Sequence, residues 1–322
     1  MKIKTFSIVI FFLACIAPAV RMDAAITFKD GWFVDADEVA TMSAQEHYSA
    51  AVNAMNRQNW EDAARHFRVV AVNFPSTSIG QESNYYLGVS YYYLNEFDFA
   101  NDAFTNYLSA RNNPRFFQET IEYKFAIAEH FRCGAKKRFF GTKRLPKWSC
   151  GLALAISIYD EVIGALPCHE IAARSLYAKG TLLWTMKDYR ESIDVFQMLT
   201  KRFPKSELAP ESYLNISKIY LDQSKVEFQN PDVLAFAQIN LRKFKESFPR
   251  EERVCEAEQI VLQITEVYAK GFYDTGRFYE RTKQPRASVI YYENAIKLFP
   301  ETSVAELCRE RLEYLRPGYN CQ

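Results

Sequence analysis

The chain of 322 residues has little glycine, 11 in all, and only 4 tryptophans. So little glycine excludes a collagen-like chain, and an apolar fraction of 48% excludes a disordered one. Neither sign of charge dominates: the net charge is +1, so the field of the whole molecule will not attract nucleic acid. After the first twenty residues, no run approaches the roughly 18 uncharged apolar residues that a spanning helix needs. These features indicate a well-filled helical interior.

The sequence does contain a repeated pattern of apolar residues and proline. At offsets of 3, 4, 7, 14 and 15 from Trp60, the chain has Ala63, Ala64, Phe67, Phe74 and Pro75. Copies in the same phase start at Phe97, Leu152, Tyr189, Leu234 and Pro285, and five of the six copies end in an aromatic residue or leucine followed by proline. Offsets of 3, 4 and 7 lie on one helical face, and proline ends a helix. The pattern predicts stacked helical hairpins.

The first helix of the hairpin carries a second signature. Nine residues before four of the markers stands a small residue, namely Ala51, Gly88, Gly180 or Gly276. A small residue there lets two helices approach closely. Together the two signatures resemble the tetratricopeptide repeat. The resemblance implies an all-α solenoid of about six hairpins over residues 43–322, ended by a polar capping helix after Pro300.

The repeat is interrupted by a basic insertion at residues 133–150. Seven basic residues lie in or beside it, and no acidic residue occurs from His130 through Tyr159. Basic and aromatic residues together suit phosphates, lipid head groups or an acidic partner. A solvated loop is the alternative. Cys133 and Cys150 bracket the insertion, and we predict a disulfide between them, which would contribute on the order of 3 kcal/mol.

The N-terminus has the layout of an export signal, with Lys2 and Lys4 before an apolar run. The run contains Ala14-Cys15, which resembles a bacterial lipoprotein box. We predict a signal peptide at 1–14, lipidation of Cys15, and a tether over 15–42. Ordinary cleavage near residues 19 or 25, or a retained anchor, are the alternatives.

Motifs for catalysis are absent from the sequence. There is no GxxxxGK, GxGxxG or GxSxG segment, and no two cysteines have CxxC spacing. The histidines are expected in different hairpins, without metal-ligand neighbours; they are His47, His66, His130 and His169. We therefore expect no enzymatic activity, no cofactor and no metal site.

In tetratricopeptide repeats, groove residues lie three before, one after and four after the small residue. These positions include Tyr48 in the first copy and Tyr85 and Tyr92 in the second. An aromatic groove suits an extended peptide. The alternative is that these rings only pack between neighbouring hairpins.

Two blocks resemble the BamD family of outer-membrane assembly lipoproteins. The first repeat, from Tyr48 to Pro75, is similar to that family's opening repeat, and the segment from Ala269 to Thr302 is similar to its last. The resemblance implies a non-enzymatic, lipid-anchored periplasmic scaffold at the outer membrane. Its expected partners are a BamA-type barrel insertase, other assembly-complex lipoproteins and unfolded β-barrel precursors. The alternatives are a periplasmic repeat protein that coordinates cell-wall processes and a repeat adaptor of a secretion system.

Overall fold

A computed structural model describes residues 26–29, 32–35, 39–110, 113–138, 146–226 and 230–319. Within these ranges the chain forms two compact units, residues 1–120 and 121–322, which we describe separately. The first unit contains strands β1 (Ile26–Lys29) and β2 (Trp32–Asp35) and four complete helices. These helices are α2 (Ala44–Asn56), α3 (Trp60–Asn73), α4 (Ser78–Tyr93) and α5 (Phe97–Ala110).

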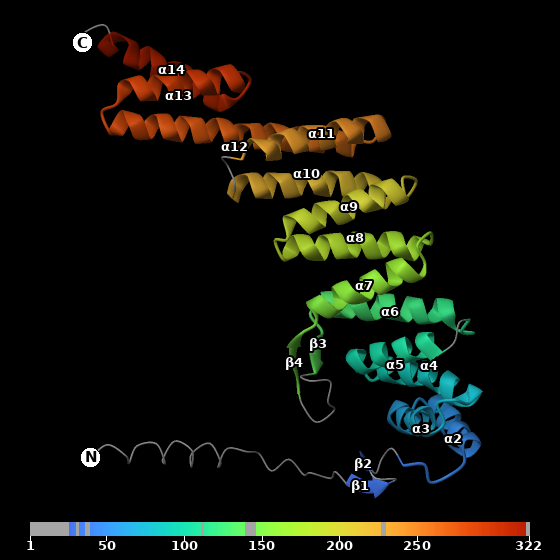
Figure 1. The fold of residues 1–322 in the computed structure, drawn as a ribbon. Coiled ribbons are helices and arrows are strands. Elements are labelled where there is room, and N and C mark those ends of the chain that lie inside the picture. The colour runs from blue at the N-terminus through green and yellow to red at the C-terminus, as the bar shows by residue number, and fades with distance from the viewer. Residues whose placement is uncertain are drawn as a thin grey trace, which may run out of the picture. The chain divides into compact units, whose positions relative to one another are not determined.

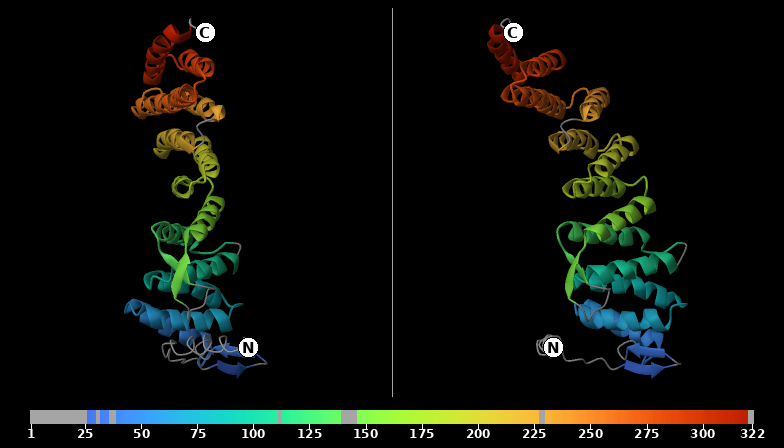
Figure 2. Two further views of the ribbon diagram at one scale, coloured as in Figure 1. Left: turned by 90° about the vertical axis from the view of Figure 1, so that its left-hand side faces the viewer. Right: turned by 60° about the vertical axis from the view of Figure 1, so that its left-hand side comes forward.

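The second unit begins inside helix α6. Its elements are α6 (Phe117–Arg132), β3 (Lys136–Arg138), β4 (Lys147–Cys150), α7 (Leu152–Ala165), α8 (Glu170–Thr185), α9 (Tyr189–Arg202), α10 (Leu208–Val226), α11 (Pro231–Ser247), α12 (Arg253–Arg281), α13 (Pro285–Leu298) and α14 (Ser303–Tyr319). Helices α2 to α13 form six consecutive pairs in the described part of the chain, and α14 follows the last pair. Within each unit, neighbouring helices run side by side (Figures 1 and 2). The predicted all-α fold of about six hairpins with a closing helix is confirmed.

The small residue of each first helix is explained by one contact. A Cβ atom built on Gly88 would lie 2.6 Å from the Phe104 ring, and one on Gly276 would lie 2.5 Å from Tyr292. In both cases the ring is sixteen residues further along the chain, and Phe67 lies sixteen residues after the fully buried Ala51. The sixteen-residue spacing between the small residue and the ring therefore reflects the packing of the second helix on the first helix of the hairpin.

The turns inside the hairpins also repeat. A non-glycine residue with positive φ stands seven positions after the small residue in four hairpins: Gln58, Asn95, Lys187 and Lys283. The next backbone N–H then donates to a carbonyl near the end of the first helix, for example from Asp188 to Leu183 at 3.0 Å. Asn59 and Asp188 accept from backbone N–H groups with their side chains and so cap the second helices.

The aromatic–proline pairs mark the ends of the second helices. Phe74, Phe203 and Phe299 are C-cap residues, each followed by proline. In each case the residue three positions later donates its backbone N–H to the aromatic residue's carbonyl; the donors are Thr77, Ser206 and Thr302. The turn therefore ends one helix and places a hydroxyl residue where the next helix begins.

The predicted tether contains structure that we did not expect. Strands β1 and β2 pair antiparallel, with Ile26 opposite Asp35 and Lys29 opposite Trp32. The segment has no helical period, and for that reason the sequence predicts a tether there. The sequence between the strands is Asp30-Gly31, a pair typical of tight hairpin turns, and this signal could have revealed the strand pair.

Candidate protein-binding faces

The first helix of each hairpin carries the candidate binding residues, so we describe its face in each unit. In the first unit the face begins at Tyr48 on α2. The edge of its ring packs on Phe67, with centroids 5.7 Å apart, and Tyr86 of α4 lies 6.2 Å away. Burial, with Tyr86 and Glu82 nearby, raises the pKa of Tyr48 to about 12. Its half-buried hydroxyl therefore stays protonated at neutral pH and can donate a hydrogen bond.

Tyr85 does not line an open groove, and that prediction is wrong. Its side chain is only 9% exposed. The ring stacks on Phe116 with centroids 4.4 Å apart and also contacts Phe104 and Tyr107. The Phe116 N–H donates to the Tyr107 hydroxyl at 2.9 Å, which fixes Phe116 against the helices. Tyr85 is buried because Phe116, at the start of the following helix, covers it.

Tyr92 belongs to a group of rings that we call the turn-end cluster: Trp60, Tyr92, Tyr93 and Phe97. Tyr92 is half-buried between the edges of Tyr93 and Phe97, at centroid distances of 5.8 and 5.7 Å. Burial, followed by the neighbouring Tyr93, raises the pKa of Tyr92. Tyr93 stacks on Trp60 at 4.3 Å and remains 51% exposed.

Tyr93 was missed as a candidate although the sequence carried a signal. It follows Tyr92 directly at the end of α4, and its partner Trp60 is the first residue of α3. Both rings lie where a first helix turns into its second helix. The cluster therefore offers an ordered, partly exposed aromatic surface, which Tyr85 does not.

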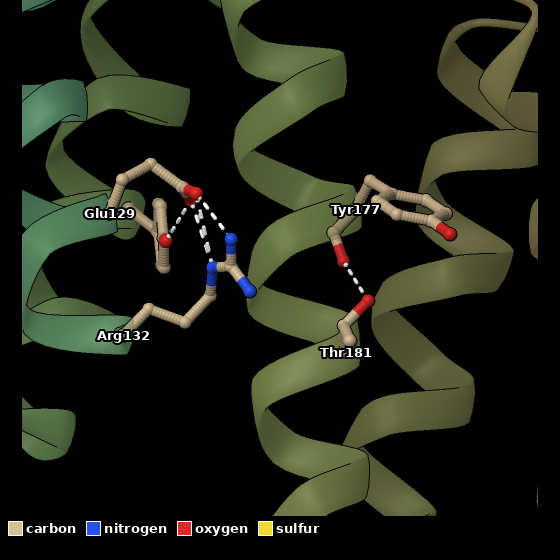
Figure 3. A network of polar contacts seen from close by, with 5 residues as sticks. Glu129, Arg132, Tyr177 and Thr181 are labelled. Carbon is tan, nitrogen blue, oxygen red and sulfur yellow. Dashed lines mark hydrogen bonds and ion pairs between the residues drawn. The ribbon is translucent and has the colours of Figure 1, made fainter. Parts of the chain in front are cut away.

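In the second unit, the corresponding positions of α6 hold an ion pair. Ala128 and Phe131 are fully buried and match the small and aromatic positions of the repeat. The residues one and four after Ala128 are Glu129 and Arg132. Arg132 Nε donates to both carboxylate oxygens of Glu129 at 3.1 Å (Figure 3). The Tyr159 hydroxyl, from α7, donates to the same carboxylate.

This network determines the charge state of its members. Burial by itself would raise the pKa of Glu129, but hydrogen bonds from Arg132 and Tyr159 hold it below its usual value. Burial and the bond to Glu129 raise the pKa of Tyr159. The carboxylate therefore stays ionised while Tyr159 stays neutral, and the charge of Glu129 is compensated internally.

The last hairpin repeats this arrangement with the signs exchanged. One and four residues after Gly276 lie Arg277 and Glu280, whose side chains are 3.2 Å apart. The Tyr292 hydroxyl donates to Glu280 at 2.9 Å, and Arg311 of α14 bonds the other carboxylate oxygen. Burial and the bond to Glu280 raise the pKa of Tyr292 to about 12. The capping helix is thus joined to α12 through the Glu280 carboxylate, whose side chain is 12% exposed.

Between these two hairpins, the face of α8 is joined to α10 by hydrogen bonds. The Trp184 indole N–H donates to Asp222 at 3.1 Å, and the Asn215 amide donates to the Tyr177 hydroxyl at 3.3 Å. Tyr177 and Thr181 are the positions three before and one after Gly180, and Thr181 donates its hydroxyl to the Tyr177 carbonyl (Figure 3). This part of the face is more polar than the first unit's.

The expectation that the histidines lie in different hairpins is wrong for two of them. His47 and His66 both belong to the α2–α3 hairpin, and their Nδ1 atoms are 2.9 Å apart. The backbone N–H groups of Thr41 and Met42 both point at His47 Nε2, at 3.3 Å. Since Nε2 accepts, the proton of neutral His47 sits on Nδ1 and is donated to His66. Sequence spacing missed the pair because the contact joins two helices.

Two further observations concern chemistry and membranes. Among the residues that the structure describes, no group of three or more His, Cys, Asp or Glu side chains is placed to hold a metal ion. Within the same ranges, no helix is both long and apolar enough to cross a membrane.

The predicted cysteine sites are placed as follows. Cys133 and Cys150 are both exposed and carry free thiols in the structure. The strand register sets Cys150 opposite Lys136, three residues beyond Cys133. Their disulfide remains a prediction for the oxidised protein. Cys15 lies outside the described residues.

Comparison with known proteins is consistent with the repeat. A tetratricopeptide repeat model matches residues 174–206, which fall on α8 and α9. Over 165 residues, 51% of this chain, the sequence is 22% identical to outer membrane protein assembly factor BamD of Haemophilus influenzae. The match spans 62% of that relative's length.

Two solved structures show a distant likeness to the chain. MamA (41 to the end) from Desulfovibrio magneticus RS-1 gives a TM-score of 0.35 at 16% identity, covering 67% of this chain and 95% of that one. A tetratricopeptide repeat protein from Parabacteroides merdae ATCC 43184 gives 0.34 at 12% identity, covering 84% and 97%. The match to the tetratricopeptide repeat model and the paired helices of the structure give the chain an all-α fold of tetratricopeptide-type helical repeats, an architecture that serves as a scaffold for protein–protein interaction.

Proposed function

We propose that this protein is a non-enzymatic scaffold of outer-membrane β-barrel assembly. It binds a BamA-type barrel insertase and other lipoproteins of the assembly complex, and it receives unfolded β-barrel precursors. The observation that carries the proposal is the similarity to BamD over 165 residues, on a chain whose helices are built as tetratricopeptide-type hairpins.

The first unit supplies the surface for precursors in this proposal. The turn-end cluster is ordered by ring contacts on several sides, so little side-chain entropy is lost when a ligand covers it. Tyr93 offers the larger exposed face, and the stack of Trp60 beneath holds it in place. Extended segments with aromatic side chains suit such a surface.

The second unit suits folded partners better. Glu129 and Glu280 are each bonded by arginine and tyrosine, so these charges are already compensated and would not select a strongly charged peptide. A partner with a preformed surface can contact the exposed edges of these networks without leaving a buried charge unsatisfied.

Lipidation of Cys15 would hold the scaffold at the periplasmic side of the outer membrane. We expect the Cys15→Ser variant to leave the membrane fraction, since one covalent lipid is removed. Intact-mass spectrometry of the wild-type protein should show a lipidated N-terminal cysteine. A mature N-terminus beyond residue 15 without lipid contradicts the anchor.

The partner proposal is tested by affinity purification of the tagged protein from detergent-solubilised membranes, followed by mass spectrometry. We expect a barrel insertase in stoichiometric amounts, and we expect it to survive a salt wash. Enrichment of cell-wall synthases or of secretion-channel components, without the insertase, assigns the scaffold to one of the alternative functions instead.

A further inference from the structure

The basic insertion forms a two-stranded ribbon next to α6 and α7. Strands β3 and β4 pair antiparallel, with Lys136 opposite Cys150 and Lys137 opposite Ser149 (Figures 1 and 2). The base of the ribbon is fixed on the helices. A Cβ atom on Gly151 would lie 2.2 Å from the ring of Phe131, which is fully buried. The ribbon is therefore held in a defined position against the hairpin.

The ribbon is strongly basic. Its described strands carry Lys136, Lys137, Arg138 and Lys147, and the sequence has no acidic residue from 130 to 159. The acidic residue just before this range, Glu129, is held by Arg132 and Tyr159. Positive charge is thus concentrated in this stretch of sequence, although the net charge of the whole chain is only +1.

Trp148 is the second feature of the ribbon. Its side chain is 76% exposed, more than any other large hydrophobic residue in the described part of the chain. In β4 the exposed residues are Trp148 and Cys150, and in β3 the exposed residue is Lys136, which pairs with Cys150. The register shifts between Lys137 and Arg138, beside Trp148. Trp148, Cys150 and Lys136 form the exposed face of the ribbon. An indole and an ammonium group stand together on an open surface.

We propose that the β3–β4 ribbon binds the anionic head-group surface of a lipid bilayer. Tryptophan favours the membrane–water interface, where its ring is half in the apolar layer and its N–H stays hydrated. Lysines beside it attract anionic lipids. The exposed face that carries Trp148 and Lys136 suits a lipid surface better than an extended acidic peptide. The proposal does not depend on the barrel-assembly function.

The test measures co-sedimentation of the full chain with vesicles of phosphatidylcholine, with and without phosphatidylglycerol. The readout is the ratio of the two partition coefficients, and every variant shares the same N-terminus. Lys136→Ala should lower this ratio on the order of five-fold at low salt, because a lysine near an anionic surface contributes roughly a factor of five. Lys243→Ala, at an exposed position on α11, is the control with equal loss of charge.

The contribution of the ring is tested separately. Trp148→Ala should weaken binding to the anionic vesicles several-fold, whereas Tyr314→Ala, which removes a ring that is 71% exposed, should not. When vesicles are added, part of the tryptophan emission of the wild type should shift to shorter wavelength. This shifting part should be absent from the Trp148→Phe variant.

Three results would overturn the proposal. One is an unchanged ratio in Lys136→Ala, and another is a Trp148 emission that does not shift when vesicles are added. The third is binding to poly-glutamate that depends on Trp148 without any binding to anionic vesicles, since this would assign the ribbon to an acidic protein.

Discussion

Replacing Tyr85 with alanine should destabilise the first unit strongly. The ring is 9% exposed and contacts Tyr86, Phe104, Tyr107 and Phe116. Burying about 150 Å² of ring surface at about 25 cal/mol per Å² stabilises the fold by roughly 4 kcal/mol. Aromatic-to-alanine changes in protein cores cost about 3–5 kcal/mol, which agrees. We therefore expect a loss of about 4 kcal/mol.

Urea unfolding followed by circular dichroism measures this loss. With a slope of roughly 2 kcal/mol per M, the midpoint of the first unit's transition should fall by about 2 M. Tyr93→Ala is the matched control: that ring is 51% exposed, and its loss should cost about 1 kcal/mol, near the value of one aromatic pair. If the urea midpoint of Tyr85→Ala is no lower than that of Tyr93→Ala, the packing of Tyr85 between helices is refuted.

Three more predictions concern packing, pH and oxidation. Gly180→Ala should cost about 1–3 kcal/mol, because the new methyl group would lie 2.9 Å from the Phe196 ring; Gly164→Ala, with nothing within 4 Å, should not destabilise, and equal thermal unfolding of the two variants would contradict this. Burial and the nearby His66 lower the pKa of His47, against the opposing effect of Glu46. As pH drops below about 6.5, the unfolded chain therefore binds a proton at this position before the folded protein does, and the free energy of unfolding should fall. Urea unfolding at pH 8 and pH 5.5 should show that His47→Leu loses less of this free energy than the wild type. Peptide mapping without reductant should find Cys133 joined to Cys150 in protein from an oxidising compartment, and two free thiols there would end that prediction.

The hairpin architecture could be predicted because the repeated positions correspond to steric contacts between helices. Glycine or alanine at one position and an aromatic ring sixteen residues later describe a single contact, as between Gly88 and Phe104. The Phe–Pro pairs mark helix ends, since proline cannot continue a helix. In a repeat fold, helices that pack together are also close in the sequence, so a sequence pattern predicts most of the helix packing.

The missed features depend on contacts that the repeat does not specify. Tyr85 occupies a groove position, but Phe116 covers it after a turn that lacks the aromatic–proline pair. The insertion separates Ala128 and Phe131 from the next marker at Leu152, so the nine-residue spacing that identifies the small residue in other copies does not identify them. The contact between His47 and His66 forms across two helices, and nothing in their spacing indicated it.

The central claim, a scaffold for barrel assembly, is tested most directly by photo-crosslinking in living cells. A photoreactive amino acid at position 93 samples the turn-end cluster, and one at the exposed position 205 serves as the control. The account predicts crosslinks from position 93 to β-barrel precursors, with few from position 205. Crosslinks from position 93 only to cell-wall synthases, or equal products from both positions, would contradict it.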